Sequence, residues 1–301
     1  MQRTTQGVGR RVEALLGQGY TFGPAVAWPW RLDARGRPVA YFTIDATGTR
    51  QQAKGGGKAE GRMAYVAGVY NPAPPDWLLP AGQAPPLQAR YLSGLYELAE
   101  LGPLLRRQAA QVGMGRAEVW VALTDGGSGL EAFAHANFNR PDLVVILDFY
   151  HAASYLEKLA KALHPADEAQ AASQAEAWCR LLKDEGGAAT LAVLRTWDWP
   201  ARRPAALREQ WAKTEEYFRN NVHRMEYPEY QAEGWHLGSG VVESACKTVV
   251  GQRLKGAGMR WGEDGAHALC HVRALYRSEK GQWDAFWKRQ HSKQPSVQQS
   301  K

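Results

Sequence analysis

Strand-like and helix-like segments alternate in the middle of this chain, and this alternation restricts its fold more than any other feature. The runs 117–124 and 142–148 are apolar and rich in β-branched residues, and segment 128–138 between them suits a short helix. Strand, helix and strand in this order imply a right-handed crossover, which makes the two strands parallel. The pattern therefore predicts an α/β fold with a partly parallel sheet.

More sheet is expected before this unit. The run 38–45 is rich in β-branched and aromatic residues and stops at Ala-Thr-Gly, which predicts a strand that ends in a turn. The segment 51–61, rich in Gly and Lys, indicates a hairpin loop, and residues 62–70 indicate the strand that returns from it. The run Asn71-Pro-Ala-Pro-Pro then ends the sheet pattern.

Most of the remaining chain is expected to be helical. Residues 87–112 carry leucines at helical spacing and predict a long helix that Pro103 kinks or splits. Residues 155–224 are rich in Ala, Glu, Lys and Arg, and they predict an all-helical block that is interrupted at 197–200. A closing helix is expected from Gly240 through Lys255. The leucines in question are Leu92, Leu95, Leu98 and Leu101.

The resulting layout is a three-strand opening, two helix–strand units, a helical insertion and a closing helix. This layout resembles an RNase H-like fold, an α/β fold with a mixed sheet, flanking helices and here an all-helical insertion before the final catalytic helix. The expected segments are an N-terminal leader at 1–37, the first part of the core at 38–154, the helical insertion at 155–234, the second part of the core at 235–280 and a basic tail at 281–301.

The composition agrees with a folded protein. Of 301 residues 45% are hydrophobic, and 12 Trp, 12 Tyr and 7 Phe stand against 16 Pro, which excludes disorder as a description of the whole chain. The longest aliphatic run, 143–147, is far shorter than the roughly 20 apolar residues that span a bilayer. The N-terminus lacks the apolar core of a secretion signal, and three cysteines without a CxxC pair favour a reducing compartment.

The positive charge is concentrated at one end of the chain. Residues 244–301 hold 11 Lys/Arg and 4 Asp/Glu, a net charge of +7 that equals that of the whole chain. Such a segment is either a solubilising tail, which we expect at least for residues 290–301, or a surface that binds a polyanion, because Lys and Arg supply most nonspecific affinity for nucleic acid.

Several common catalytic motifs are missing. The sequence Gly55-Gly-Gly-Lys58 lacks both the upstream glycine and the Ser/Thr of a P-loop. Neither Ser128 nor Ser239 stands in a G-x-S-x-G sequence, so a serine hydrolase is unsupported. No G-x-G-x-x-G sequence follows a predicted strand, so a dinucleotide fold is unsupported as well.

Three carboxylates at the ends of predicted elements remain. Asp45 and Asp125 close predicted strands, and Glu243 lies in the first turn of the closing helix. Each alone is explained by turn or helix-capping chemistry. In an open α/β sheet, however, ligands bind outside the carboxyl ends of the strands, where both aspartates would lie together. Such oxygen donors suit Mg²⁺ or Mn²⁺, and a pair of these ions supports phosphoryl transfer.

Five runs, in order along the chain, make the sequence similar to a known family. They resemble the motifs of ISKra-type insertion-sequence transposases, which are DDE enzymes more distantly related to Mutator-like transposases. The similarity covers residues from about 45 to 276, and the segment around Glu243 is its most diagnostic part. The runs are Ile44-Asp-Ala-Thr-Gly-Thr49, Leu123-Thr-Asp-Gly-Gly127, Ile146-Leu-Asp-Phe-Tyr-His151, Gly238-Ser-Gly-Val-Val-Glu-Ser-Ala-Cys-Lys247 and Arg253-Leu-Lys-Gly-Ala-Gly-Met-Arg-Trp261.

The resemblance implies roles for particular residues. Asp45, Asp125 and Glu243 match the metal-binding DDE positions, which implies Mg²⁺ or Mn²⁺, as two ions. His151 belongs to a D-x-x-H signature and either orients DNA or a metal-bound water, or packs under the next helix. Asp148 is an alternative ligand that ranks below Asp125.

Basic and aromatic side chains offer candidates for DNA contacts. Four cations flank the glutamate helix, and they either contact phosphates or form a solvated helix face. Three tryptophans are either base-stacking residues or, more commonly for such residues, part of the core. The cations are Lys247, Arg253, Lys255 and Arg260, and the tryptophans are Trp197, Trp199 and Trp235.

The expected function is metal-dependent DNA cleavage and strand transfer. The expected partners are transposon ends and target DNA, bound by a homodimer or higher oligomer in the cytoplasm at the nucleoid. One alternative is a metal-dependent nuclease of the same fold, and another is a catalytically silent DNA-binding protein derived from a transposase. Only 44 residues precede Asp45, so recognition of the terminal repeats is expected to be missing or supplied elsewhere.

Overall fold

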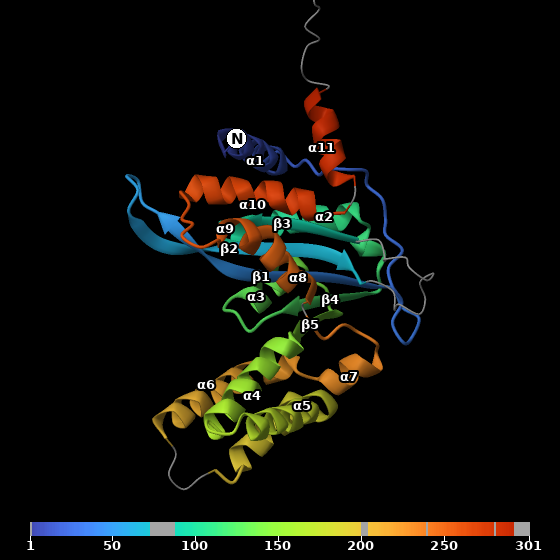
Figure 1. Cartoon of the computed structure of the whole chain (residues 1–301). Helices are drawn as coiled ribbons and strands as arrows, with labels where there is room; N and C mark the ends of the chain where they lie inside the picture. The colour runs from blue at the N-terminus through green and yellow to red at the C-terminus, as the bar shows by residue number, and fades with distance from the viewer. Residues whose placement is uncertain (1, 73–87, 200–203, 239, 280, 292–301) are drawn as a thin grey trace, which may run out of the picture.

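A mixed five-stranded sheet lies at the centre of the protein, with helices on both faces (Figure 1). The computed structural model describes residues 2–72, 88–199, 204–238, 240–279 and 281–291. The strands are β1 (Val39–Gln52), β2 (Lys58–Asn71), β3 (Gln88–Gly94), β4 (Val119–Thr124) and β5 (Leu143–Leu147).

The order of the strands across the sheet is β3-β2-β1-β4-β5. β1 pairs antiparallel with β2, and β2 pairs antiparallel with β3. β1 pairs parallel with β4, and β4 pairs parallel with β5. The expected α/β class with a mixed sheet and flanking helices is therefore confirmed, including the parallel section at β4 and β5.

Helices occupy most of the rest of the described chain. Short 3-10 turns follow α2 and α6, and a π-helix, Cys246–Gly251, joins α8 to α9. The α-helices are α1 (Gln2–Gly17), α2 (Leu98–Gln111), α3 (Leu130–Asn137), α4 (Phe149–Leu163), α5 (Glu168–Thr196), α6 (Ala205–Asn221), α7 (Tyr227–Ala232), α8 (Gly240–Ala245), α9 (Gln252–Leu254), α10 (Glu263–Arg277) and α11 (Gln282–His291).

Alternation of side chains along the strands produces a core on each face of the sheet. On one face, Phe42 and Ile44 pack with residues of α1, α2, α3 and α11. On the other face, Val121 and Ile146 pack with helices α4 to α7. Beside that second core, Val66 packs with α8, the π-helix and α10. The helical insertion, α8 and the π-helix thus share one face of the sheet, whereas α10 also contributes Leu275 to the core of the other face.

Two predicted boundaries around the first hairpin are wrong. β1 does not end at the Ala-Thr-Gly sequence, because the register with β2 continues past it from Asp45 to Gln52. The loop comprises only residues 53–57, and β2 begins at Lys58. Backbone hydrogen bonds to the partner strand satisfy the polar groups of a segment whose composition alone suggests a turn.

The predicted helix over 87–112 is wrong in its first half. Residues 88–94 form β3, with Leu92 paired to Ala67 of β2, and only α2 is helical. Spacing of leucines by three is also compatible with a strand buried on both faces, and pairing with β2 decides between the two. α2 runs through Pro103 and starts with a capping box between Glu97 and Glu100.

The later elements were predicted more accurately. β4, α3 and β5 lie within the expected segments, and the helical block from α4 to α6 is confirmed. The break after α5 falls at Trp197. The closing helix begins at Gly240 and ends at Leu254, close to the expected residues.

The two ends of the described chain also belong to the fold. α1 lies in the segment expected as a leader, and its Val12 and Leu15 are buried. α11 lies in the segment expected as a tail, and its Phe286 is buried. Pro74 and Pro75 of the run that begins at Asn71 and the residues from 292 to 301 lie outside the described residues. Within the described chain, no helix is long and apolar enough to cross a membrane.

Candidate active site

Three carboxylates form a row on one face of the sheet. In the parallel register, Ile44 of β1 pairs with Thr124 of β4, and Thr124 pairs with Leu147 of β5. These three residues immediately precede Asp45, Asp125 and Asp148. Adjacent strands lie about 4.8 Å apart, so these carboxylates are neighbours across the sheet. Leu123 and Ile146, two places before Asp125 and Asp148, both pack on the face that carries the helical insertion. The row therefore faces that side.

Asp45 is a half-buried carboxylate in an acidic setting. Burial raises its pKa, and the negative charge of Asp125 raises it further. The thiol of Cys246 donates a hydrogen bond to Asp45 Oδ2 (3.3 Å), and the Ala46 amide donates to Oδ1 (2.6 Å). These two bonds and the charge of His151 oppose the rise in pKa. A cation beside Asp45 would relieve the repulsion between the two aspartates.

Glu243 joins the row from helix α8. Val242 and Ala245 of this helix are buried against the sheet, while Glu243 is exposed. Desolvation of the carboxyl group raises its pKa, as do the charges of Asp148 and Asp45, and the charge of His151 opposes them. The structure thus brings together the carboxylates that the sequence analysis singled out, from three strands and one helix.

Asp125 and Asp148 differ in their surroundings. Asp125 is half-buried, and its Oδ1 accepts a hydrogen bond from the Gly127 amide (2.8 Å). Asp148 is fully buried and caps helix α4, where its Oδ1 accepts from the His151 amide (2.8 Å). Asp148 therefore has a structural role at the start of α4, and its charge also acts on Glu243.

His151 lies in the first turn of α4, beside two tyrosines. Its ring centroid is 5.8 Å from that of Tyr155 and 5.8 Å from that of Tyr217, and the two tyrosine rings stack on each other at 3.9 Å. His151 is half-buried, and its charge affects the pKa values of both Asp45 and Glu243. His151 therefore packs against aromatic side chains of the helices and also lies near the carboxylates.

Arg224, from the end of the helical insertion, is a neighbour that the sequence analysis missed. It is buried and donates to the Thr124 hydroxyl (3.0 Å) at the end of β4. Its Nε also lies 3.4 Å from Glu131 Oε2 in α3. Arg224 is 100 residues from Thr124 along the chain, so no local pattern could have indicated this contact.

Cys246 is a second missed neighbour. It is buried in the π-helix that follows α8, and its thiol bonds to Asp45. Burial raises the pKa of this thiol, and the charge of Asp45 raises it further, which keeps Cys246 protonated as a hydrogen-bond donor. π-helical turns are rare and occur often at functional sites. No spacing in the sequence distinguishes this turn from an ordinary helix.

The four predicted phosphate contacts are all exposed on the segment after Glu243. Lys247 lies on the π-helix, and Arg253 lies on α9. The ammonium group of Lys255 donates a hydrogen bond to the Thr47 hydroxyl, two residues from Asp45. Arg260 lies beside the tip of the β1–β2 hairpin.

The three tryptophans are packing residues. Trp199 is buried, and Trp197 packs edge-on against Trp178 with ring centroids 5.3 Å apart. Trp235 stacks on Tyr230 at 6.1 Å. The core interpretation therefore accounts for all three.

Glu13, His267 and His271 form a separate cluster between α1 and α10. Among the described residues, the potential metal-ligand atoms of this group all lie within 4.8 Å of one another. The side-chain oxygens of Asp45, Asp125 and Glu243 do not meet this criterion. The Leu95 amide donates to His267 Nδ1 (2.9 Å), so a neutral His267 carries its proton on Nε2, which faces Glu13 Oε1 at 3.2 Å. A metal at Nε2 would displace that proton. The cluster is better explained as a hydrogen-bonded link between the helices.

No protein-family model matches the chain, and no curated protein matches it significantly.

Proposed function

We propose that this chain is a DDE-type transposase with an RNase H-like fold, which cleaves and joins DNA in a metal-dependent reaction. The observation that carries the proposal is the row of Asp45 and Asp125 on adjacent parallel strands, with Glu243 brought near Asp45 by α8. Three segments that are distant in the sequence converge there on one acidic site.

The arrangement of the sheet supports the fold in this proposal. Three antiparallel strands come first, and two parallel strands follow on the far side of β1. The helical insertion separates β5 from the helix that carries Glu243, as the resemblance to ISKra-type transposases implies. Asp125 and Asp148 directly follow the carboxyl ends of β4 and β5, where open α/β sheets bind their ligands, and Asp45 lies beside them in the middle of β1.

The residues fit a divalent metal ion. Asp45, Asp125 and Glu243 would hold it through oxygen atoms, the donors that Mg²⁺ and Mn²⁺ prefer. Burial raises the pKa of Asp45 and of Glu243, and neighbouring negative charges, Asp125 at Asp45 and Asp148 and Asp45 at Glu243, raise them further, which favours a cation in this site. The oxygen atoms of these three carboxylates do not all lie within 4.8 Å of one another. Such spacing suits Mg²⁺, which usually takes one or two carboxylates and completes its coordination with waters and substrate phosphates. When bound, such ions activate the attacking hydroxyl and stabilise the leaving oxygen.

Neighbouring residues position these carboxylates. The Cys246 thiol and the Ala46 amide orient Asp45, and the Gly127 amide orients Asp125. Asp148 fixes the start of α4, which carries His151 to the edge of the site. These contacts keep the acidic side chains in place despite their repulsion, which is the preorganisation that phosphoryl transfer requires.

The decisive experiment is incubation of the purified protein with supercoiled and linear DNA, with Mg²⁺, with Mn²⁺ and with EDTA. Glu243→Gln removes one carboxylate charge from the site, and Glu229→Gln makes the same change at an exposed position on α7. We expect metal-dependent nicking and joining in the wild type and in Glu229→Gln, and a loss of at least 100-fold in Glu243→Gln.

The products separate the alternatives. Hydrolysis without joining would assign the protein to the nucleases of the same fold. DNA binding without cleavage under every condition would assign it to the silent DNA-binding proteins. Full cleavage by Glu243→Gln would remove this residue from the mechanism.

A further inference from the structure

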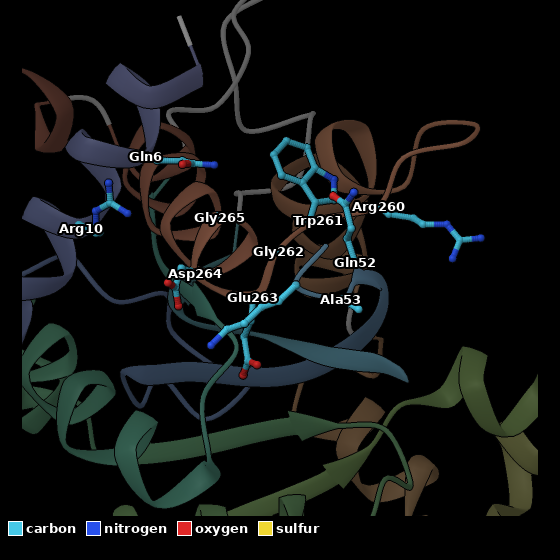
Figure 2. A pocket seen from close by; sticks show the side chains of 11 residues that line it. Gln6, Arg10, Gln52, Ala53, Arg260, Trp261, Gly262, Glu263, Asp264 and Gly265 are labelled. Carbon is cyan, nitrogen blue, oxygen red and sulfur yellow. The ribbon is translucent and has the colours of Figure 1, made fainter. Parts of the chain in front are cut away.

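A basic surface lies at the tip of the β1–β2 hairpin, whose first strand also carries Asp45. Two open cavities lie there on either side of Arg260, of about 720 Å³ and about 510 Å³. The larger lies between α1, the hairpin tip and the start of α10 (Figure 2), and the smaller lies along β1 and β2 below the tip. We call them together the hairpin surface. Its cations are Arg10, Arg50, Lys54, Lys58 and Arg260.

The backbone under this surface is held in place by long-range contacts. The Gln52 amide donates to the Trp261 carbonyl (2.8 Å), and the Trp261 amide donates to the Arg50 carbonyl (3.1 Å). On the other side, α1 packs so closely on α10 that a Cβ at Gly9 would lie 2.0 Å from the Ala268 carbonyl oxygen. Three segments distant in the sequence therefore present their cations from one fixed scaffold.

The cations are available for a ligand. All five are exposed, and within the described chain none of them forms an ion pair with a carboxylate. Two acidic residues stand between Arg10 and Arg260 at the start of α10 (Figure 2). Of these, Glu263 forms an ion pair with Arg62 at 3.0 Å. Asp264 then remains as the acidic residue in the lining of the larger cavity that opposes the cations. The surface thus keeps a clear excess of positive charge.

Strand β1 links the hairpin surface to the candidate active site. Lys255 bonds to Thr47, which lies between the hairpin and Asp45 on β1. Asp45 and Gln52 are seven residues apart on this strand. At about 3.3 Å per residue, the hairpin tip lies about 23 Å from Asp45. B-DNA rises about 3.4 Å per base pair, so this distance corresponds to about seven base pairs.

We propose that the hairpin surface binds the phosphate backbone of duplex DNA about seven base pairs from the reacting phosphate. The position of the reacting phosphate rests on the proposed function, whereas the cations and their scaffold do not. Flexible Lys and Arg side chains on an open surface contact phosphates without reading bases. The hairpin surface therefore positions the DNA and makes no sequence-specific contacts with its bases.

The test measures the salt dependence of DNA binding. Fluorescence anisotropy with a labelled 30-base-pair duplex gives the binding constant between roughly 50 and 200 mM salt. We compare the wild type, the double variant Arg50→Ala/Lys58→Ala, and the control Lys161→Ala/Lys183→Ala, whose two exposed lysines lie on α4 and α5 of the helical insertion. Both double variants lose the same net charge.

We expect a plot of log binding constant against log salt to be less steep by about 1.8 in Arg50→Ala/Lys58→Ala, because each lost phosphate contact removes about 0.9. The loss of affinity is expected to be the same for duplexes of unrelated sequence, and the control is expected to match the wild type. Equal slopes in all three proteins would overturn the proposal, as would the absence of DNA binding by the wild type at low salt.

Activity distinguishes this proposal from the proposed function. If the slope changes as expected but the wild type cleaves no DNA, the hairpin surface is a DNA-binding surface and the transposase assignment fails. If the wild type cleaves DNA and the slope is unchanged, the assignment stands and the DNA takes another path across the protein.

Discussion

At the scale of single residues, the acidic site is expected to reduce the stability of the fold. The folded-state pKa of Asp45 is raised by burial and by Asp125, so the folded protein binds a proton at Asp45 more readily than the unfolded chain does. The stabilisation from this proton is present at low pH and is lost as the pH rises from the ordinary carboxyl value of 3.8 through the raised folded value. At pH 7 the ionised Asp45 therefore lowers the free energy of unfolding.

Asp45→Asn is therefore expected to raise the melting temperature at pH 7 in EDTA, while it abolishes metal-dependent cleavage. Each 1 kcal/mol of relieved repulsion corresponds to about 2 °C for a chain of this size. The advantage of the variant is expected to shrink as the pH falls toward 4. Thermal melts followed by circular dichroism measure this, with Asp184→Asn on the exposed surface of α5 as the matched control. A lower melting temperature for Asp45→Asn would contradict the electrostatic account.

At the scale of elements, the contact between α1 and α10 depends on one glycine. A Cβ at Gly9 would lie 2.0 Å from the backbone oxygen of Ala268, whereas a Cβ at Gly7 would have no neighbour within 4 Å. Both glycines lie within α1, so helix propensity alone favours alanine at each by about 1 kcal/mol. The two positions thus separate propensity from packing.

We expect Gly9→Ala to lower the free energy of unfolding by about 1–3 kcal/mol, because α1 must move away from α10. Gly7→Ala is expected to leave stability unchanged or to raise it by up to about 1 kcal/mol. Urea unfolding of the three proteins at equilibrium measures both effects. Equal stabilities for the two variants would show that α1 does not pack on α10 in solution.

At the scale of the whole molecule, the helical insertion and the sheet share one core. Trp178 and Phe218 of the insertion pack in the same cluster as Val121 and Ile146 of the sheet. Buried polar contacts join the two parts as well, since the Tyr227 hydroxyl donates to the Leu147 carbonyl at 3.0 Å. Arg224 adds its bond to Thr124. The insertion is therefore expected to fold with the sheet as one cooperative unit.

Hydrogen exchange measured by mass spectrometry tests this cooperativity. Amides in the centres of α5 and α6 are expected to open with the same free energy as those of β1 and β4, and with the same dependence on denaturant. An insertion that opens at clearly lower denaturant than the sheet would show that it is a separate folding unit.

Much of the fold could be predicted from the sequence, because local patterns determine it. Apolar β-branched runs placed β4 and β5, and periodic leucines placed the helical block. Asp45, Asp125 and Glu243 could be proposed as site residues because they stand beside such elements or within their first turn. These features depend on side chains that are neighbours along the chain.

Pairing between distant segments decided the rest. β3 is a strand and not a helix because β2 lies beside it, and β1 extends past Asp45 because β2 continues to pair with it. Arg224 and Cys246 reach the acidic site only once the insertion and the π-helix have packed on the sheet. The sequence by itself determined which residues are acidic and which segments are strand or helix formers. The tertiary structure decided which of them meet, because hydrogen bonds and burial between remote segments outweigh local preference.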